Sequence, residues 1–465
     1  MGIALVWPRY VFRNFSTPLG VLYIASALKS NNYAFDFIDG TITSIEETNK
    51  MLADKKPELL MISLFTAFAD SAFEVIKAYR KAVPDGKVIA GGPHATIFPR
   101  ETLENGVDIV VIGEGEKTII EIMKNPDRLG EIDGVGYRKD GNIIINEKKH
   151  YIHDLDNVLF PDRTLLSRDY FTSGSMGMIT SRGCPFSCAF CQPTLRRLFG
   201  VAVRRRSVRN VMEEIENTRK VYGVNQVRFT DDGLTYDKEW LVELCNSFLE
   251  KNMGITWTAS SRADTMPDME TLKLMKRAGC TKISIGVESG DDRIRNEILR
   301  KGVSREKIIS AFRDVHAAGM KGLAFLMVGS PTETMESVRN TIRILEDARP
   351  DEAQVTLTSP LPKTFLYDYC KERNIIETEK WKDYVYSYES HLKLENFSKS
   401  GIEAVHDALQ YTIFMRSAVL KAVKFDIGFS GPFMVLGNPL IRRMIRLVNK
   451  SPARKYIKKL YYSLS

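Results

Sequence analysis

The chain has 465 residues, of which 44% are hydrophobic and 27% are charged, and this composition excludes a disordered or fibrous protein. The net charge of +8 comes from residues 401–465, which hold eleven Lys and Arg against three Asp and Glu, whereas the rest of the chain is balanced. A basic tail of this kind argues against a general nucleic-acid-binding protein, whose positive charge would lie on a folded face.

The start of the chain, its apolar segments and its cysteines bear on localisation. The first residues, MGIALVWPRY, lack the charged region and long apolar stretch of a signal peptide. No apolar run approaches the roughly 18 residues of a transmembrane helix. The six cysteines do not form a disulfide framework, which favours a reducing compartment. We therefore expect a cytoplasmic protein, with peripheral membrane contact as an alternative.

Residues 1–125 alternate between short apolar strands and amphipathic helices, which indicates an α/β domain with a doubly wound parallel sheet. Strands are predicted at 3–7, 33–39, 58–65, 87–92 and 108–113. Helices are predicted at 19–31, 45–56, 70–83, 99–106 and 116–123. Ligands of such sheets bind beyond the carboxyl ends of the strands.

Residues 126–168 change character and are interpreted as a hairpin and linker. An Asp-Gly pair at 140–141 predicts the turn of a hairpin over residues 134–149. A polar connector, DLDNVLFPDR, follows at 154–163.

Strand–helix alternation returns over residues 169–370 and predicts a partial (β/α)6 barrel. Strands are predicted at 176–183, 226–232, 256–262, 282–289, 322–331 and 352–362. In such barrels the chemistry lies at the carboxyl ends of the strands, where this chain places its cysteines and several charged residues.

Residues 371–465 are predicted to form a helical tail without a catalytic motif. Residues 438–450, NPLIRRMIRLVNK, predict a basic amphipathic helix. It could rest on anionic lipid, pack its apolar face on the barrel, or dock a protein or peptide substrate.

Three cysteines, Cys184, Cys188 and Cys191, fall within eight positions after the first barrel strand. Structural zinc needs four closed ligands, and here no fourth cysteine or histidine is near. Three thiolates on a four-iron cluster instead leave one iron open for a substrate. Zinc remains the alternative. The other cysteines, Cys245, Cys280 and Cys370, are interpreted as buried free thiols.

The C-x3-C-x-aromatic-C spacing after a barrel strand resembles the radical S-adenosylmethionine superfamily. The resemblance implies a [4Fe-4S] cluster on the three cysteines, with S-adenosylmethionine on its open iron. It also implies contacts to S-adenosylmethionine from residues in the cysteine loop and at successive strand ends, namely Phe190, Asp231, Asp232, Ser260, Arg262 and Glu288. Helix caps or barrel salt bridges are the structural alternative for the charged members of this set.

GGPHAT at 91–96 and VIGEGE at 111–116 follow two strands of the first domain. A dinucleotide site is disfavoured because no GxGxxG follows the first strand. The order of these motifs over residues 3–370 resembles the cobalamin-binding class B radical enzymes. The resemblance implies that cobalamin is lined by Thr17, Pro18, Ser63, Thr66, Gly91, Gly92, His94, Gly113 and Glu114. His94 is expected to line the nucleotide tail of cobalamin rather than to ligate cobalt. A structural or response-regulator-like domain is the alternative.

These cofactors together predict a cobalamin-dependent radical methyltransferase that acts on an unactivated carbon of a lipid, another hydrophobic molecule or a peptide. A radical cyclisation or rearrangement is the second hypothesis, and a cobalamin sensor with a structural metal is the third. The expected partners are a flavodoxin- or ferredoxin-like reductant and the substrate, without nucleic acid. Lys363 stands where the family's usual proline-glycine-threonine motif has glycine.

Overall fold

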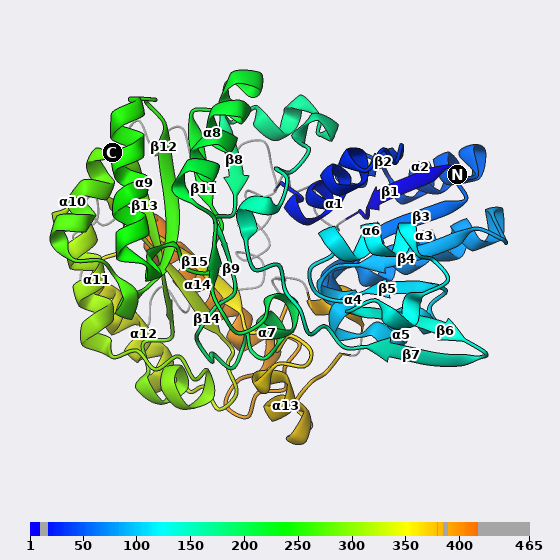
Figure 1. Ribbon diagram of the computed structural model, residues 1–465. Coiled ribbons are helices and arrows are strands. Elements are labelled where there is room, and N and C mark those ends of the chain that lie inside the picture. The colour runs from blue at the N-terminus through cyan, green and yellow to red at the C-terminus, as the bar shows by residue number, and fades with distance from the viewer. Residues whose placement is uncertain (10–16, 379, 385–388, 417–465) are drawn as a thin grey trace.

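The structure is a computed structural model that describes residues 1–9, 17–378, 380–384 and 389–416. Two α/β domains lie side by side in Figure 1, the first in blue to cyan and the second mostly in green to orange. In the part of the chain that is described, no helix combines the length and apolar character needed to cross a membrane. The basic helix predicted at 438–450 lies outside the described residues, so its membrane role stays a prediction.

The first domain is built on a seven-stranded sheet with the strand order β2-β1-β3-β4-β5-β6-β7. Its strands are β1 (Ile3–Trp7), β2 (Asp36–Asp39), β3 (Leu59–Ser63), β4 (Lys87–Gly91), β5 (Ile109–Val111), β6 (Val135–Lys139) and β7 (Asn142–Asn146). Its helices are α1 (Leu19–Ser30), α2 (Ile45–Lys55), α3 (Ala69–Ala82), α4 (Pro93–Ile97), α5 (Pro99–Glu104) and α6 (Glu116–Lys124).

The hairpin predicted after the first domain is part of that domain's sheet. Its turn lies at Asp140 and Gly141, both at positive φ, as the sequence indicates. Strand β6 pairs antiparallel with β5, and β7 pairs antiparallel with β6. The sheet is therefore mixed rather than wholly parallel, and it extends to Asn146 instead of ending near residue 125. The hairpin satisfies the backbone groups of β5, which would otherwise be an open edge.

The two faces of the first sheet belong to different cores. Alternate side chains of a strand point to opposite faces, so Ile3 and Leu5 join a core with α1 and α6, whereas Ala4 and Val6 join one with α2 and α3. The first of these cores continues into the barrel domain. The domains thus share buried apolar surface, which fixes their relative position.

The second domain is a partial barrel whose six parallel strands follow the order β15-β14-β13-β12-β11-β8. Its strands are β8 (Ser175–Met178), β11 (Gln226–Phe229), β12 (Thr256–Arg262), β13 (Cys280–Glu288), β14 (Lys321–Val328) and β15 (Glu352–Leu357), with a small antiparallel pair of β9 (Ser181–Arg182) and β10 (Arg204–Arg205). Its helices are α7 (Thr194–Phe199), α8 (Val208–Tyr222), α9 (Lys238–Lys251), α10 (Met269–Arg277), α11 (Arg305–Ala317), α12 (Met335–Ala348) and α13 (Phe365–Glu372).

Helix α14 (Lys399–Arg416) covers the open edge of the barrel at β15. The Gln410 side chain accepts a hydrogen bond from Val355 N at 2.9 Å and donates one to the Ala353 carbonyl at 3.0 Å. A side-chain amide can supply both a donor and an acceptor in this way. The tail therefore satisfies two backbone groups on the open edge of the last strand.

Candidate active site

The cysteine loop leaves the barrel after β9 and ends at α7. Gly183, at φ +98°, begins the loop, and a Cβ there would lie 2.6 Å from the Ala202 carbonyl oxygen, so only glycine fits. A turn follows in which Cys191 N and Gln192 N donate to the Cys188 carbonyl at 3.1 and 3.0 Å. Cys188 is buried, whereas Cys184 and Cys191 retain partial access to solvent.

The three thiols share one environment. Burial raises the pKa of Cys188 and of Cys191. The charges of Lys301 and Arg262 offset part of this rise at Cys188, whereas the charge of Cys188 adds to the rise at Cys191. Arg262 donates to Cys188 Sγ at 3.2 Å, and Tyr236 Oη lies 3.7 Å from Cys184 Sγ. Buried thiols of this kind become thiolates only when a strong positive charge joins them.

The two aspartates after β11 have different surroundings. Asp231 is buried, and its Oδ1 accepts hydrogen bonds from the Thr180 amide, the Thr180 hydroxyl and the Ser181 hydroxyl. Asp232 is an exposed residue, but its carboxylate lies among many protein atoms. The resulting loss of hydration raises the pKa of Asp232 to about 6. Asp231 therefore fixes the start of the cysteine loop, and Asp232 is the carboxylate available to a ligand.

Arg262, at the end of β12, stands between the thiols and the barrel wall. Its guanidinium lies 3.7 Å from the Phe186 ring centre, makes two 2.9 Å contacts with Asp264, and reaches Cys188. These contacts hold the planar group in one orientation. Ser260 precedes it on the same strand and is half-buried.

Glu288 and Lys301 form a buried ion pair at 2.7 Å beside this arginine. Glu288 has φ +61° at a register shift between β13 and β14, and a Cβ on Gly286 would lie 2.5 Å from Lys301 Nζ. The predicted ligand contact Glu288 is thus held by a lysine that the sequence did not single out. Phe190 lies in a small apolar cluster beneath the loop, with a packing role.

The predicted residues of the first domain, apart from Thr17 and Pro18, lie at or just beyond the carboxyl ends of β3, β4 and β5. Gly92, at φ +99°, would place a Cβ 2.7 Å from the Leu64 carbonyl and 3.2 Å from Ser63 Oγ. Gly113 N donates to Thr96 Oγ1 at 2.9 Å. The Gly91 carbonyl accepts a hydrogen bond from Leu64 N at 2.7 Å, so backbone hydrogen bonds hold this edge together.

Thr17 and Pro18 lie at the seam between the domains. Thr17 Oγ1 is 3.4 Å from the position that a Cβ on Gly177 of β8 would take, so Thr17 packs against the first barrel strand. Pro18 is buried and precedes the first residue of α1. These two residues lie at the seam, and their predicted contact with cobalamin stays a prediction.

His94 is fully buried within aromatic rings. Its ring centroid lies 5.9 Å from Phe73, 5.1 Å from Phe98 and 5.1 Å from Trp381, and its Nδ1 is 3.3 Å from Thr66 Oγ1. Burial lowers the pKa of His94 to about 4, so the ring is neutral. Trp381 belongs to the chain after the barrel, which no pattern near His94 could have indicated.

The Glu114 side chain joins a buried ion-pair network, and its predicted contact with cobalamin stays a prediction. Its carboxylate is fully buried and binds Arg182 at 2.8 Å and Arg204 at 2.8 Å. Arg182 also pairs with Glu116 at 2.5 Å, and Ile152 N donates to Glu114 at 2.8 Å. This network, here called the Glu114–Arg182 network, ties the first domain to the residue two positions before Cys184. Two features of the sequence could have indicated this network: the acidic GEGE motif and the arginine-rich segment at 204–206.

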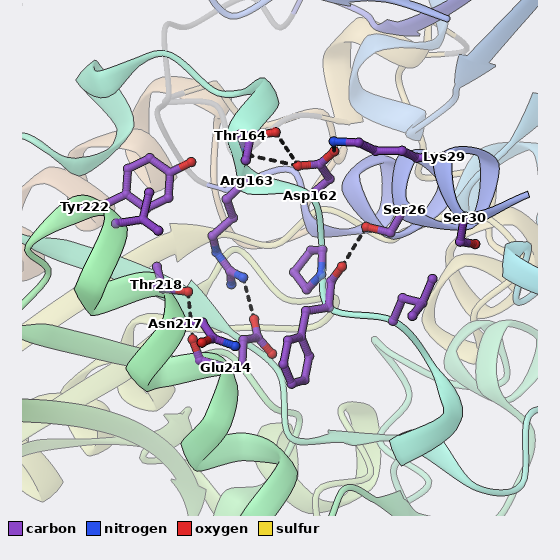
Figure 2. Close-up of a pocket in the computed structure, with 14 residues that line it drawn as sticks. Ser26, Lys29, Ser30, Asp162, Arg163, Thr164, Glu214, Asn217, Thr218 and Tyr222 are labelled. Atoms are coloured by element: carbon purple, nitrogen blue, oxygen red, sulfur yellow. Dashed lines mark hydrogen bonds and ion pairs between the residues drawn. The ribbon is translucent and has the colours of Figure 1, made fainter. Parts of the chain in front are cut away.

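A groove of about 440 Å³ lies elsewhere on the same seam. Figure 2 shows it between α1, the linker and α8, with Arg163 bonded to Glu214 at its base. None of the predicted site residues lines it. Its walls include the carboxyl-terminal parts of α1 and α8, so it lies toward the amino ends of the strands. The groove is therefore separate from the candidate active site.

Comparison with known proteins places this geometry in a family. Residues 178–345 match the family model described as the radical SAM superfamily, and residues 10–123 match the B12 binding domain. An uncharacterized methyltransferase of Pyrococcus horikoshii is 30% identical over 87% of this chain and 89% of its own length. The chain belongs to the cobalamin-dependent radical S-adenosylmethionine enzyme family.

One further relative and one solved structure are similar to the chain. The anaerobic magnesium-protoporphyrin IX monomethyl ester cyclase of Cereibacter sphaeroides is 26% identical over 77% of this chain and 60% of its own length. The cobalamin- and [4Fe-4S]-bound methyltransferase TsrM of Kitasatospora setae superposes with a TM-score of 0.67 at 18% identity, over 80% of this chain and 75% of TsrM. This last likeness concerns the fold.

The cofactors of this radical enzyme are a [4Fe-4S] cluster, S-adenosylmethionine and cobalamin, and the residues present fit them. In the described ranges, no three His, Cys, Asp or Glu side chains are placed to hold one metal ion. A cubane cluster makes a different demand, because its thiolates bind separate irons. One loop brings the three thiols together, and in the first domain one nitrogen of His94 is buried without a partner in the described structure.

Proposed function

We propose that this radical enzyme transfers a methyl group to an unactivated carbon of a hydrophobic substrate. The observation that carries the proposal is the direct link between the two cofactor-binding edges. The Gly113–Glu116 loop of the first domain and the strand leading to Cys184 are joined by the buried Glu114–Arg182 network. An enzyme that passes a group between two cofactors needs such a fixed spacing.

The chain's own residues take distinct parts in this proposal. Cys184, Cys188 and Cys191 would hold the cluster, and Asp232 would receive the methionyl ammonium of S-adenosylmethionine. Arg262, fixed by Asp264 and Phe186, would orient the methionyl carboxylate. When bound, the cluster supplies the electron that cleaves S-adenosylmethionine, and cobalamin supplies the methyl group.

The protonation of these groups supports binding at neutral pH. Asp232, with a pKa of about 6, is ionised at pH 7 and can attract an ammonium group. One oxygen of Asp231 accepts three hydrogen bonds from residues 180 and 181, so Asp231 orients the loop rather than the ligand. The ion pair of Glu288 with Lys301 leaves no net charge at the end of β13.

Radical cyclisation is the second candidate, and the likeness to the cyclase of Cereibacter sphaeroides favours it. The methyltransferase of Pyrococcus horikoshii is matched over a larger share of its own length, 89% against 60%. We rank methyl transfer first on this ground.

Product analysis separates the two candidates. The reconstituted holoenzyme is incubated anaerobically with S-adenosylmethionine, a reductant and cobalamin, together with candidate hydrophobic substrates. Methyl transfer predicts that 5′-deoxyadenosine and S-adenosylhomocysteine both accumulate in proportion to product. 5′-Deoxyadenosine without S-adenosylhomocysteine would favour cyclisation, and neither product with any substrate would contradict both. The Cys188→Ala variant is the control for adventitious cleavage.

A further inference from the structure

A tyrosine that no sequence pattern singled out lies against the cysteine loop. Tyr236 ends the short turn Leu234–Tyr236, which comes soon after the two aspartates that follow β11. Its Oη is 3.7 Å from Cys184 Sγ, and the same hydroxyl donates to the Asp232 carbonyl at 2.8 Å. One hydroxyl therefore joins a thiol that would hold the cluster to the backbone of the residue that would receive the methionyl ammonium.

The other residues of the turn hold its backbone in place. Leu234 is fully buried in the core of the barrel. The Thr235 hydroxyl lies 2.7 Å from the Ser261 hydroxyl of β12. Because both neighbours are fixed by packing and hydrogen bonding, the Tyr236 ring extends toward the cysteine loop from a rigid support.

Space and packing set the position of the Tyr236 ring. A Cβ on Gly233 would overlap the ring, so any side chain at 233 would displace it. On the cysteine loop, Phe186 meets the Tyr236 ring edge-on, with the ring centres 5.4 Å apart. Phe186 also packs against the Arg262 guanidinium, which donates to Cys188 Sγ at 3.2 Å. Two hydrogen-bonding groups, a phenol and a guanidinium, are thus placed at two of the three thiols.

The phenol has one proton to donate, and its acceptor depends on the state of Cys184. A thiol can donate its own proton to the Tyr236 oxygen, which leaves the phenol proton on the Asp232 carbonyl. A thiolate can only accept, and a charged acceptor forms a stronger hydrogen bond than a neutral carbonyl does. Rotation about the Cζ–Oη bond is enough to redirect the proton, so the Tyr236 hydroxyl is placed to donate to Cys184 once that sulfur is a metal ligand.

We propose that Tyr236 raises the reduction potential of the iron–sulfur site by donating a hydrogen bond to the Cys184 thiolate. Reduction adds negative charge, and a donor on a ligating sulfur stabilises the more negative, reduced state. Tyr236 is thus a positioning residue that changes the free energy of reduction and adds no chemical step. The inference rests on the family's cluster, goes beyond the proposed function, and holds for methyl transfer and cyclisation alike.

The test is a redox titration of the reconstituted holoenzyme without S-adenosylmethionine, followed by electron paramagnetic resonance of the reduced cluster. Tyr236→Phe removes the hydroxyl and keeps the ring. It should lower the equilibrium constant for one-electron reduction by about threefold to tenfold. A tenfold change corresponds to a potential about 59 mV more negative. Iron and sulfide contents should equal those of the unaltered protein, because all three thiols remain.

Two further variants keep the test decisive. Gly233→Ala keeps the hydroxyl but displaces the ring, so its potential should fall as that of Tyr236→Phe does. Tyr222→Phe removes a hydroxyl at the separate groove beside α8 and should leave the potential unchanged. An unchanged potential in Tyr236→Phe, an equal fall in Tyr222→Phe, or loss of iron from Tyr236→Phe would overturn the proposal. None of these outcomes would bear on methyl transfer.

Discussion

The carboxyl-end edge of the barrel and that of the first sheet, which meet at the seam between the domains, carry different kinds of residues. The barrel edge carries thiols and charged groups, with Arg262 on Cys188 and Glu288 paired to Lys301. The edge of the first domain carries glycines and aromatic rings, with Trp7 packed edge-on against Phe65 and Phe68 at 5.5 and 5.3 Å. Fixed charges suit a small ionic ligand, whereas rings and bare backbone suit a large planar one.

The comparison also explains how one site can serve both ligands. In the barrel edge, each buried charged side chain needs a partner of opposite charge, because an unpaired buried charge lowers stability. In the edge of the first domain, a ligand is held by burial of apolar surface and by close approach to the backbone. Glycine at 92 leaves the space for that approach. The Glu114–Arg182 network is the point at which the two meet, since its carboxylates come from the first domain and its arginines from the second.

The largest expected effect comes from removing a thiol of the charged edge. Cys188→Ala should abolish the bound iron and sulfide, because two thiolates cannot hold a four-iron cluster in place. Cobalamin affinity should change by less than about threefold, since the apolar edge is untouched. Iron and sulfide analysis and equilibrium cobalamin binding measure the two. Cys245→Ala, a buried thiol on α9, is the control and should retain its iron.

The next effect concerns the link between the edges. Arg182→Ala leaves Glu114 buried with part of its charge uncompensated, and should lower the free energy of unfolding by about 3–5 kcal/mol. Arg305→Ala breaks an exposed pair with Asp347 and should cost less than about 1 kcal/mol. Denaturant unfolding measures both. A similar small loss in the two variants would contradict the role of the network.

The apolar edge predicts a pH dependence through His94. The unfolded histidine binds a proton near its usual pKa of about 6.5, and the folded one only near 4. Stability from the neutral ring is therefore full above pH 6.5 and is lost as the pH falls toward 4. Between pH 7 and pH 4.5 the unaltered protein should lose about 2 kcal/mol more unfolding free energy than His94→Leu. Parallel losses in the two proteins would show that His94 is not a buried neutral ring.

The smallest effect distinguishes the two aspartates of the charged edge. Asp232→Asn should weaken S-adenosylmethionine binding by about tenfold and leave stability within about 0.5 kcal/mol. In the unaltered protein, binding should weaken as the pH falls below 6, where Asp232 becomes protonated. Asp231→Asn should show the reverse pattern, a clear loss of stability. Equilibrium dialysis and thermal unfolding measure the two, and equal behaviour of the variants would contradict the division of roles.

Strand and helix positions were predictable because their signal is local. The apolar run at 3–7 and the helix predicted at 19–31 correspond to β1 and α1 within a residue or two. The cysteine loop and the polar strand ends were predictable for the same reason, since consecutive parallel strands end on one side of a sheet. The joining of the 134–149 hairpin to the first sheet was not, because strand pairing depends on which edge is free.

The sequence by itself determined which residues could carry chemistry: three closely spaced thiols, carboxylates at strand ends, and glycines where backbone must be bare. Only the tertiary structure decided how each is used, because a charge is assigned by its neighbours. Glu114 is taken by Arg182 and Arg204, Glu288 by Lys301, and His94 is enclosed by Trp381 from a segment almost 300 positions away in the chain. Asp231 and Asp232 are adjacent and chemically identical, and folding alone buries one in hydrogen bonds and leaves the other open to a ligand.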